Sequence, residues 1–184
     1  KVMSKDDIRS AETPKGSRYS DPSRLQAQIE QVFLPAFHLL PELAADRVLH
    51  PFELMPGLLD EPLVLSKNTQ GDLRCLSNVC THRGMILCET ESSSNSIRCG
   101  YHGRRFDLDG KLLDAPGFEG ALNFPRDEDD LVELPIHQWG PLRFVSLQDG
   151  GDFERLLSPL QERLGFLPLE SFKLATDEIQ VFEI

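Results

Sequence analysis

The sequence predicts a mainly β protein: an antiparallel β-sandwich preceded by a helical segment and followed by a short helix and strand. From about residue 46 onward, short apolar runs recur between turns rich in Gly, Asn and Asp, which is typical of antiparallel strands. The runs do not alternate with long helical patterns, so a sheet built from βαβ units is not expected. With 184 residues, 40% hydrophobic and 27% charged, the chain has the composition of a globular domain with attached segments.

The N-terminal part is predicted to be a polar lead-in followed by a helix. In the segment DPSRLQAQIEQVF, residues 21–33, the apolar residues fall near helical spacing. Asp21 can cap this helix, and Pro22 fits its first turn because proline has no N–H to leave unpaired there. We therefore expect residues 1–45 to form a lead-in and helix outside the β domain.

The β domain is predicted to span residues 46–150. The turn TQGD lies between LVLSKN and LRCLSNV in residues 63–79, which predicts a hairpin. Further along, WGPLRFVSL, residues 139–147, alternates its faces as a strand does. The segment GDFERLLSPLQERLGF then predicts a helix, and the final FKLATDEIQVFEI reads as the opening strand of a further domain. Residues 151–184 are thus expected to be a linker helix and the first strand of a domain that lies outside this chain.

Charge and cysteine content narrow the classes of partner. The net charge of −11 argues against nucleic acid, which rewards clustered Lys and Arg. No apolar run approaches the roughly 20 residues that a membrane-spanning helix needs, and the N-terminal residues do not resemble a secretory signal. Four cysteines in such a chain are expected to be free or metal-bound in a reducing compartment. We therefore predict a cytoplasmic protein that binds neither nucleic acid nor membrane.

Two short loops carry the most specific signal. Cys80-x-His82 and Cys99-x-x-His102 each place one thiol beside one imidazole, and each histidine is closely followed by a glycine, where the backbone can turn tightly. Two thiolates and two imidazoles make a four-ligand set for zinc or for an iron–sulfur cluster. Zinc fingers usually pair cysteine with cysteine and histidine with histidine. Here each loop instead contributes one cysteine and one histidine. Two such facing loops favour a two-iron cluster with both cysteines on one iron and both histidines on the other.

These residues also carry a family resemblance. NVCTHR, residues 78–83, and CGYHGRRFDLDGKLLDAPG, residues 99–117, resemble the N-terminal Rieske domain of ring-hydroxylating oxygenase large subunits. WGPLRFVSL is similar to the strand that follows in those proteins, and the likeness covers roughly residues 46–150. The resemblance implies a Rieske [2Fe–2S] cluster in which Cys80 and Cys99 bind one iron and His82 and His102 bind the other.

Two departures from related patterns are visible. The residue after the His-Gly pair of the second loop is usually tryptophan in the family, but here it is Arg104. The Rieske proteins of respiratory complexes join their two loops by a disulfide, whereas the matching positions here are Met85 and Gly100. The sequence therefore resembles the oxygenase branch.

The resemblance implies electron transfer to the mononuclear iron site of an aromatic-ring-hydroxylating-type dioxygenase or monooxygenase. A reductase or ferredoxin would donate the electrons, and the Fe(II) site would lie in a catalytic domain of the same or a neighbouring subunit, in a trimer. After His102 the only histidine is His137, so this chain alone is expected to pass electrons without oxygenating, and we assign it no catalytic residue. Two alternatives stay open: a stand-alone Rieske ferredoxin and a structural zinc module.

The remaining candidates receive plainer interpretations. Cys75 and Cys88 fit no ligand spacing and are expected to be small buried residues. His38, His50 and His137 are expected to be packing or surface histidines, and Tyr101 and Arg83 to shield or orient the cluster. Residues 126–133, RDEDDLVE, are expected to form a solvated charged turn, with an electron-partner docking face as the sharper alternative.

Overall fold

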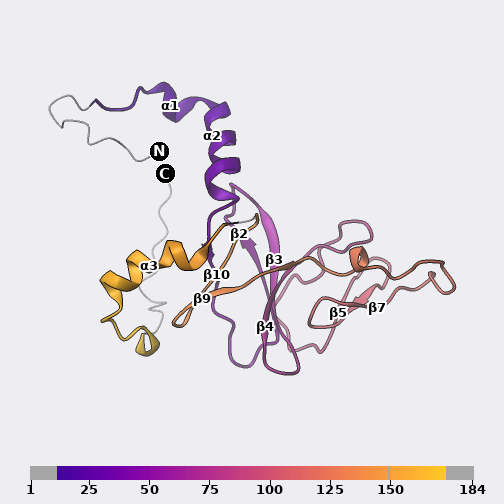
Figure 1. The fold of residues 1–184 in the computed structure, drawn as a ribbon. Coiled ribbons are helices and arrows are strands. Elements are labelled where there is room, and N and C mark those ends of the chain that lie inside the picture. Colours follow the sequence, from indigo (N-terminus) through magenta and orange to yellow (C-terminus); the bar gives the residue numbers. More distant parts are fainter. Residues whose placement is uncertain (1–11, 149, 173–184) are drawn as a thin grey trace.

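The structure, a computed structural model, describes residues 12–148 and 150–172. They form three small antiparallel sheets, with a helical arm at the N-terminal end and a helix at the C-terminal end (Figure 1). The predicted mainly β, antiparallel class is confirmed. The strand expected at the C-terminal end falls almost entirely in residues 173–184, outside the described residues.

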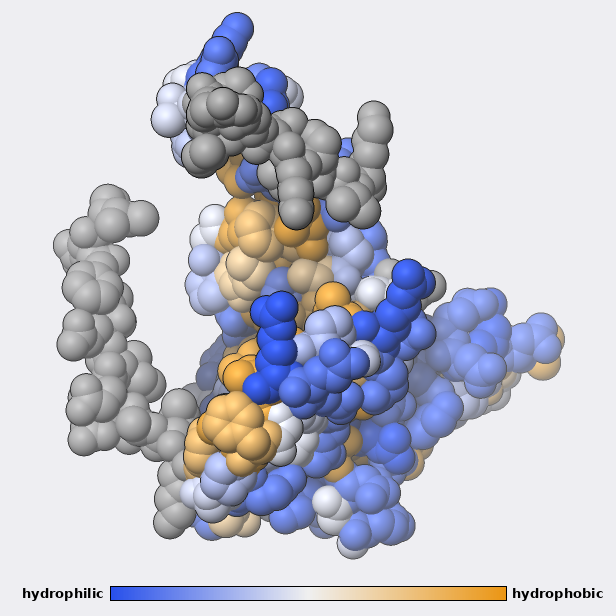
Figure 2. Space-filling model, turned by 60° about the vertical axis from the view of Figure 1, so that its left-hand side comes forward, coloured by the Kyte–Doolittle hydropathy of each residue, from blue (hydrophilic) through white to orange (hydrophobic). Residues whose placement is uncertain are grey.

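The N-terminal arm is helical over residues 21–33, where the sequence predicts a helix, and a further short helix precedes it within the predicted lead-in. It contains α1 (Ser17–Ser20), α2 (Pro22–Gln28) and a π-helical turn, η2 (Ile29–Phe33). Asp21 caps α2, because its Oδ1 accepts a hydrogen bond from the Ser23 N–H at 3.0 Å, and Pro22 occupies the first turn. Apolar side chains, Leu25 and Val32 among them, remain exposed on this arm. Figure 2 shows hydrophobic surface along the arm.

The largest sheet has four strands in the order β2 (Leu49–Leu54), β3 (Glu61–Lys67), β4 (Leu73–Ser77) and β8 (Glu133–Leu134). The predicted hairpin is confirmed as β3 and β4, with Leu65 opposite Cys75. β3 is buried on both faces from Leu63 to Ser66. This central strand separates two apolar cores, one of which contains Cys75 and the other Cys80 and Cys99.

A second sheet has the order β1 (His38–Leu39), β10 (Leu142–Val145), β9 (His137–Trp139). Helix α3 (Phe153–Leu164) packs against it, and its first residue, Phe153, contacts the rings of Phe37, His137 and Phe144. The predicted helix at residues 151–166 is thereby confirmed. The chain then makes a short 3₁₀ turn, η4 (Leu169–Ser171).

The third sheet is the smallest and contains the second Cys/His loop. Its order is β5 (Ile97–Arg98), β6 (Arg105–Phe106), β7 (Leu112–Asp114), and a 3₁₀ turn, η3 (Asp127–Asp129), follows it in the chain. Its strands are short, but Ile97 and Phe106 are fully buried beneath it. Burial of these two side chains ties the loop between β5 and β6 to the protein interior.

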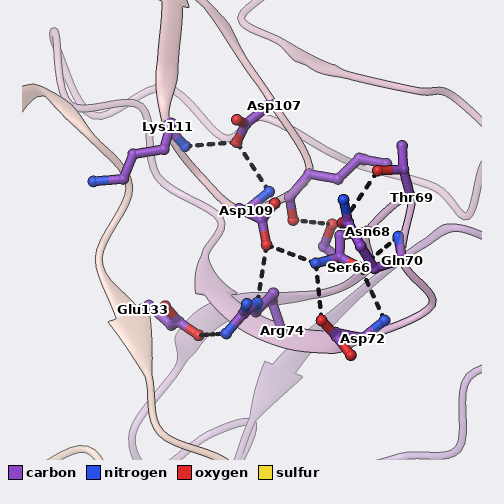
Figure 3. A network of polar contacts seen from close by, with 11 residues as sticks. Ser66, Asn68, Thr69, Gln70, Asp72, Arg74, Asp107, Asp109, Lys111 and Glu133 are labelled. Atoms are coloured by element: carbon purple, nitrogen blue, oxygen red, sulfur yellow. Dashed lines mark hydrogen bonds and ion pairs between the residues drawn. The ribbon is translucent and has the colours of Figure 1, made fainter.

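A polar network links this small sheet to the large one (Figure 3). Asp109, in the turn between β6 and β7, accepts hydrogen bonds from Asn68 at 2.9 Å and from Arg74 at 3.0 Å. Arg74 also donates to Glu133 of β8 at 3.1 Å. The turn after β3 and strand β4 therefore fix the position of the hairpin that follows the second loop.

Candidate metal centre

The first Cys/His loop is closed by two backbone hydrogen bonds. The Cys80 N–H donates to the Met85 carbonyl at 2.8 Å, and the Gly84 N–H donates back to the Cys80 carbonyl at 3.0 Å. Val79 and Ile86 pair across the base of the loop as an antiparallel bridge. The loop is thus the turn of a very short hairpin that follows β4.

The second loop repeats this pattern at the same spacing. The Cys99 N–H donates to the Arg104 carbonyl at 2.8 Å, and the Gly103 N–H donates to the Cys99 carbonyl at 3.1 Å. Arg98 and Arg105 pair at its base, as Val79 and Ile86 do in the first loop. The two loops are therefore related by a local pseudo-symmetry of their backbones.

Glycine is required at one position in each loop. Gly84 has φ of 72° and Gly103 has φ of 80°, in the left-handed region that other L-residues adopt at a cost. Each glycine stands four residues after its cysteine and directs its N–H back to the cysteine carbonyl. The turn that presents the ligands thus depends on this residue type.

The structure brings the four predicted ligands together. The rings of His82 and His102 lie 4.8 Å apart between centroids and meet edge-on at 64°. Cys80 and Cys99 are 2% and 3% exposed, and their thiols lie within hydrogen-bonding reach of each other. His82 is half-buried and His102 is exposed. The cysteines therefore pair on the inner side and the histidines on the outer side.

Backbone donors surround the two sulfurs. Burial raises the pKa of the Cys80 thiol, against a hydrogen bond from the His82 N–H that favours its thiolate. Burial acts in the same direction on Cys99, but the N–H groups of Tyr101 and His102 donate to its sulfur and bring the pKa of that thiol below its ordinary value. Both loops therefore supply the N–H···S hydrogen bonds that stabilise a metal-bound thiolate.

The pairing of the four side chains bears on the kind of metal site that they fit. Cys80 lies against Cys99, and His82 lies against His102. A tetrahedral zinc site needs four such groups around a single metal, whereas a two-iron cluster takes only two protein ligands on each iron. The arrangement of one cysteine pair and one histidine pair thus fits the cluster better than zinc.

Arg104 was not assigned a role from the sequence, and the structure buries it beside both loops. Its residue is 5% exposed, and its Nη1 donates to Thr81 Oγ1 at 3.0 Å and to Asp129 Oδ1 at 3.2 Å. The rings of Phe118 and Phe124, which contact each other, lie against its guanidinium, with centroids 5.3 and 5.5 Å from Cζ. The sequence offered one signal for this role, a charged residue directly after the second His-Gly pair. The partners of Arg104 could not be read from it, because Thr81 and Asp129 lie 23 and 25 positions away.

The predicted solvated charged turn at residues 126–133 is wrong for two of its carboxylates, Asp129 and Asp130. The Asp129 side chain is only 14% exposed and pairs with Arg104. Asp130 accepts hydrogen bonds from the Leu112 N–H at 2.7 Å and from Lys111 Nζ at 2.8 Å. These carboxylates have specific partners in the small sheet and in the second loop, so they hold η3 against the candidate site.

The other singled-out residues lie apart from this site or at its rim. Tyr101 is exposed, and its ring lies over that of His102 with centroids 3.7 Å apart. Arg83 is also exposed. The prediction that these two residues shield or orient a cluster stays a prediction. Buried Cys75 and half-buried Cys88 have thiols whose pKa burial raises to about 12 and about 11. The remaining histidines have separate partners. His38 donates to the Phe33 carbonyl, and His50 pairs with Glu91. The His137 ring packs against the rings of Phe37 and Phe153.

Parts of this chain are similar in sequence to known proteins. Residues 47–125 match the family described as the Rieske [2Fe-2S] domain. The chloroplastic choline monooxygenase of Amaranthus tricolor is 31% identical over 140 residues, which cover 76% of this chain and 31% of that protein. The carnitine monooxygenase oxygenase subunit of Escherichia coli K12 is 34% identical over 91 residues, 49% of this chain and 24% of that protein. The chain spans about a third of the length of the choline monooxygenases it matches.

Solved structures share the fold. The apo form of the quaternary ammonium Rieske monooxygenase CntA matches with a TM-score of 0.70 and 24% identity, over 81% of this chain and 44% of that one. Naphthalene 1,2-dioxygenase from Rhodococcus sp. matches with a TM-score of 0.67 and 25% identity, over 78% of this chain and 34% of that one. In the part of the chain that is described, no helix is long and apolar enough to cross a membrane.

Proposed function

Because this chain contains a Rieske [2Fe–2S] domain of the kind found in the alpha subunits of Rieske oxygenases, we propose that Cys80, His82, Cys99 and His102 bind its cluster. The cysteines would hold one iron and the histidines the other. The observation that carries this proposal is the pairing of buried thiols and adjacent imidazole rings across two loops with the same backbone hydrogen bonds. The chain's role is then to accept and pass on single electrons.

The bound cluster supplies one-electron chemistry, at a potential above that of an all-cysteine cluster because two neutral imidazoles replace two anionic thiolates. The protein's own residues do the rest. The buried cysteine side is kept from water, and N–H groups of both loops bond the sulfurs. The exposed His102 and half-buried His82 present the other side to a partner. Electrons are therefore expected to enter or leave at the histidine edge.

We also propose that the chain works within a longer oxygenase. A reductase or ferredoxin would donate electrons, and a catalytic domain of the same or a neighbouring subunit, in a trimer, would hold a mononuclear Fe(II). Residues 1–45, 46–150 and 151–184 would then be the lead-in, the cluster domain and the link to that catalytic domain. The relatives include monooxygenases of choline and carnitine and a biphenyl dioxygenase alpha subunit. The proposal thus admits quaternary amines as well as aromatic rings as substrates, and is not confined to ring hydroxylation.

The cluster assignment is tested on purified protein by its visible spectrum, by iron and acid-labile sulfide analysis, and by electron paramagnetic resonance after reduction. We expect two irons and two sulfides per chain and a Rieske-type signal. Cys80→Ser and His102→Ala should each abolish the colour and the signal. Cys88→Ala and His50→Ala are the matched controls, and both should keep the cluster. Cys88 bonds Asn78 through its backbone, which alanine keeps, and the His50 side chain pairs with Glu91.

Three results separate the proposal from its alternatives. Colourless protein that contains zinc and no sulfide would establish the zinc module. A cluster retained in Cys80→Ser or His102→Ala would refute the ligand assignment. Oxygen uptake by the longer protein with choline, carnitine or biphenyl, supported by a reductase, would distinguish an oxygenase from a stand-alone ferredoxin and identify the class of substrate.

A further inference from the structure

Arg104 places a permanent positive charge beside both ligand loops. It directly follows Gly103 in the second loop, and its carbonyl accepts the Cys99 N–H, so its backbone is part of the ligand turn. Its side chain crosses to the first loop and donates to Thr81, the residue between Cys80 and His82. The guanidinium therefore contacts both loops at once.

This charge is largely removed from water, and one of its donors has no partner in the described part of the chain. The Arg104 side chain is 6% exposed, and Phe118 and Phe124 lie over the guanidinium. Its one carboxylate partner is Asp129, and its buried Nε–H has no hydrogen-bond partner within the described residues. A buried N–H without a partner is unfavourable, even in a guanidinium that is paired with a carboxylate. It becomes more favourable when a negative charge develops close by.

A cluster held by these loops develops such a charge. With two thiolates and two neutral imidazoles, the oxidised form carries no net charge. One electron from a one-electron donor converts a ferric iron to ferrous and leaves the centre with a single negative charge, while no bond forms or breaks. A fixed cation in a low-dielectric site stabilises that reduced form more than the oxidised form.

Resting on the proposed cluster assignment, we propose that the buried Arg104 guanidinium is a positioning charge that raises the cluster's reduction potential. At this position the family usually has tryptophan, an uncharged residue. Asp129 opposes part of the effect because its carboxylate lies against the same guanidinium. The two side chains therefore act on the potential in opposite directions, although both hold the same loop in place.

Potentiometric titration of the cluster-containing protein at neutral pH tests this. Arg104→Met, which keeps an apolar stem, should make reduction at least tenfold less favourable, a downward shift of about 59 mV or more for one electron. Arg104→Lys keeps the charge and should stay close to the wild type. Asp129→Asn removes the opposing charge, keeps an oxygen for the hydrogen bond, and should shift the potential upward.

The directions of the shifts decide the matter. A purely structural role would disturb the same loop in both variants and move both potentials the same way, or neither, and either result would overturn the proposal. If Arg104→Met loses its cluster, the reduction potential of Asp129→Asn tests the proposal alone. An upward shift supports the proposal, and any other result overturns it. A wild-type protein without cluster overturns the proposed function and this inference with it. Brown protein with unshifted potentials overturns only the inference.

Discussion

The two Cys/His loops have the same backbone but opposite surroundings. Both are closed by the same two hydrogen bonds, and both turn at a glycine with positive φ. Five residues after its cysteine, the first loop has Met85, which is 40% exposed, and the second has Arg104, which is 5% exposed. The apolar side chain faces solvent and the charged one is buried, the reverse of what hydrophobicity alone predicts.

This contrast separates two requirements of the site. The backbone needs only a glycine and a short hairpin, and the chain satisfies it twice with different sequences. The side chain that closes each loop has a different task. On the first loop it is a surface residue, and on the second it joins the loop to Thr81 and to Asp129 of η3. The second loop is therefore the one that is anchored by charge.

Exchanging these two side chains for alanine should give the largest difference. Arg104→Ala leaves the buried Asp129 carboxylate without its cation, which is expected to lower the free energy of unfolding by ~3–5 kcal/mol. Met85→Ala trims an exposed side chain and should change it by less than about 0.5 kcal/mol. Urea denaturation at equal cluster content measures both. Equal losses in the two variants would show that the burial contrast has no energetic consequence.

The Thr81 hydroxyl should come next. It donates to the Asp129 carbonyl at 2.7 Å and accepts from Arg104 at 3.0 Å, so it is the polar link between the loops. Thr81→Val keeps the shape but leaves both partners unsatisfied, and should cost about 1–3 kcal/mol. Thr81→Ser retains the hydroxyl and should recover most of that loss in the same denaturation experiment. A neutral Thr81→Val would argue that water replaces the hydroxyl.

The ligands and their loops could be predicted because their signal is local. Cys80-x-His82 and Cys99-x-x-His102 each lie within one turn, and residue type alone indicates the metal chemistry. The hairpin in residues 63–79 was equally readable, since turn residues and strand residues follow one another directly. Each of these features depends on residues a few positions apart.

The anchoring of the second loop could not be predicted, because it depends on distant residues. Arg104 and Asp129 are 25 positions apart, and nothing in the charged run at residues 126–133 shows which carboxylate will be buried. The division into three small sheets was not predicted either. β5 and β6 have two residues each, too short for the alternation that marks a strand in a sequence. Tertiary packing decides both features.

The glycines should behave alike where the closing side chains differ. Gly84→Ala and Gly103→Ala each force a side chain into positive φ and should each cost ~1–2 kcal/mol in unfolding free energy. A Cβ on Gly84 meets nothing within 4 Å, and one on Gly103 meets Pro116 Cγ at 3.4 Å, an ordinary contact. Gly100→Ala is the matched control, because Gly100 has room and no positive φ, and its effect should be close to zero. If the two variants lost unequal amounts of unfolding free energy, the two loops would share their hydrogen bonds but not the energetic role of the glycine.

The smallest effect is expected at Cys88, which flanks the first loop. Burial raises the pKa of its thiol from 9.0 to about 11, so at pH 8 its reactive thiolate is about a hundredfold scarcer than that of an ordinary cysteine. Iodoacetamide treatment of the cluster-containing protein, followed by peptide mass spectrometry, should leave Cys88 largely unmodified at that pH. Rapid modification there would contradict its burial.

The same shift fixes the sign of the pH dependence. Because the folded protein holds the Cys88 proton more tightly than the unfolded chain, this thiol's contribution to stability is full below about pH 9 and is lost as pH rises through about 11. Cys75, with a pKa raised to about 12, should act in the same direction. Comparing urea midpoints at pH 8 and pH 10.5 in wild type and Cys88→Ala measures this. The variant should lose less stability than the wild type between the two pH values, because its side chain no longer titrates.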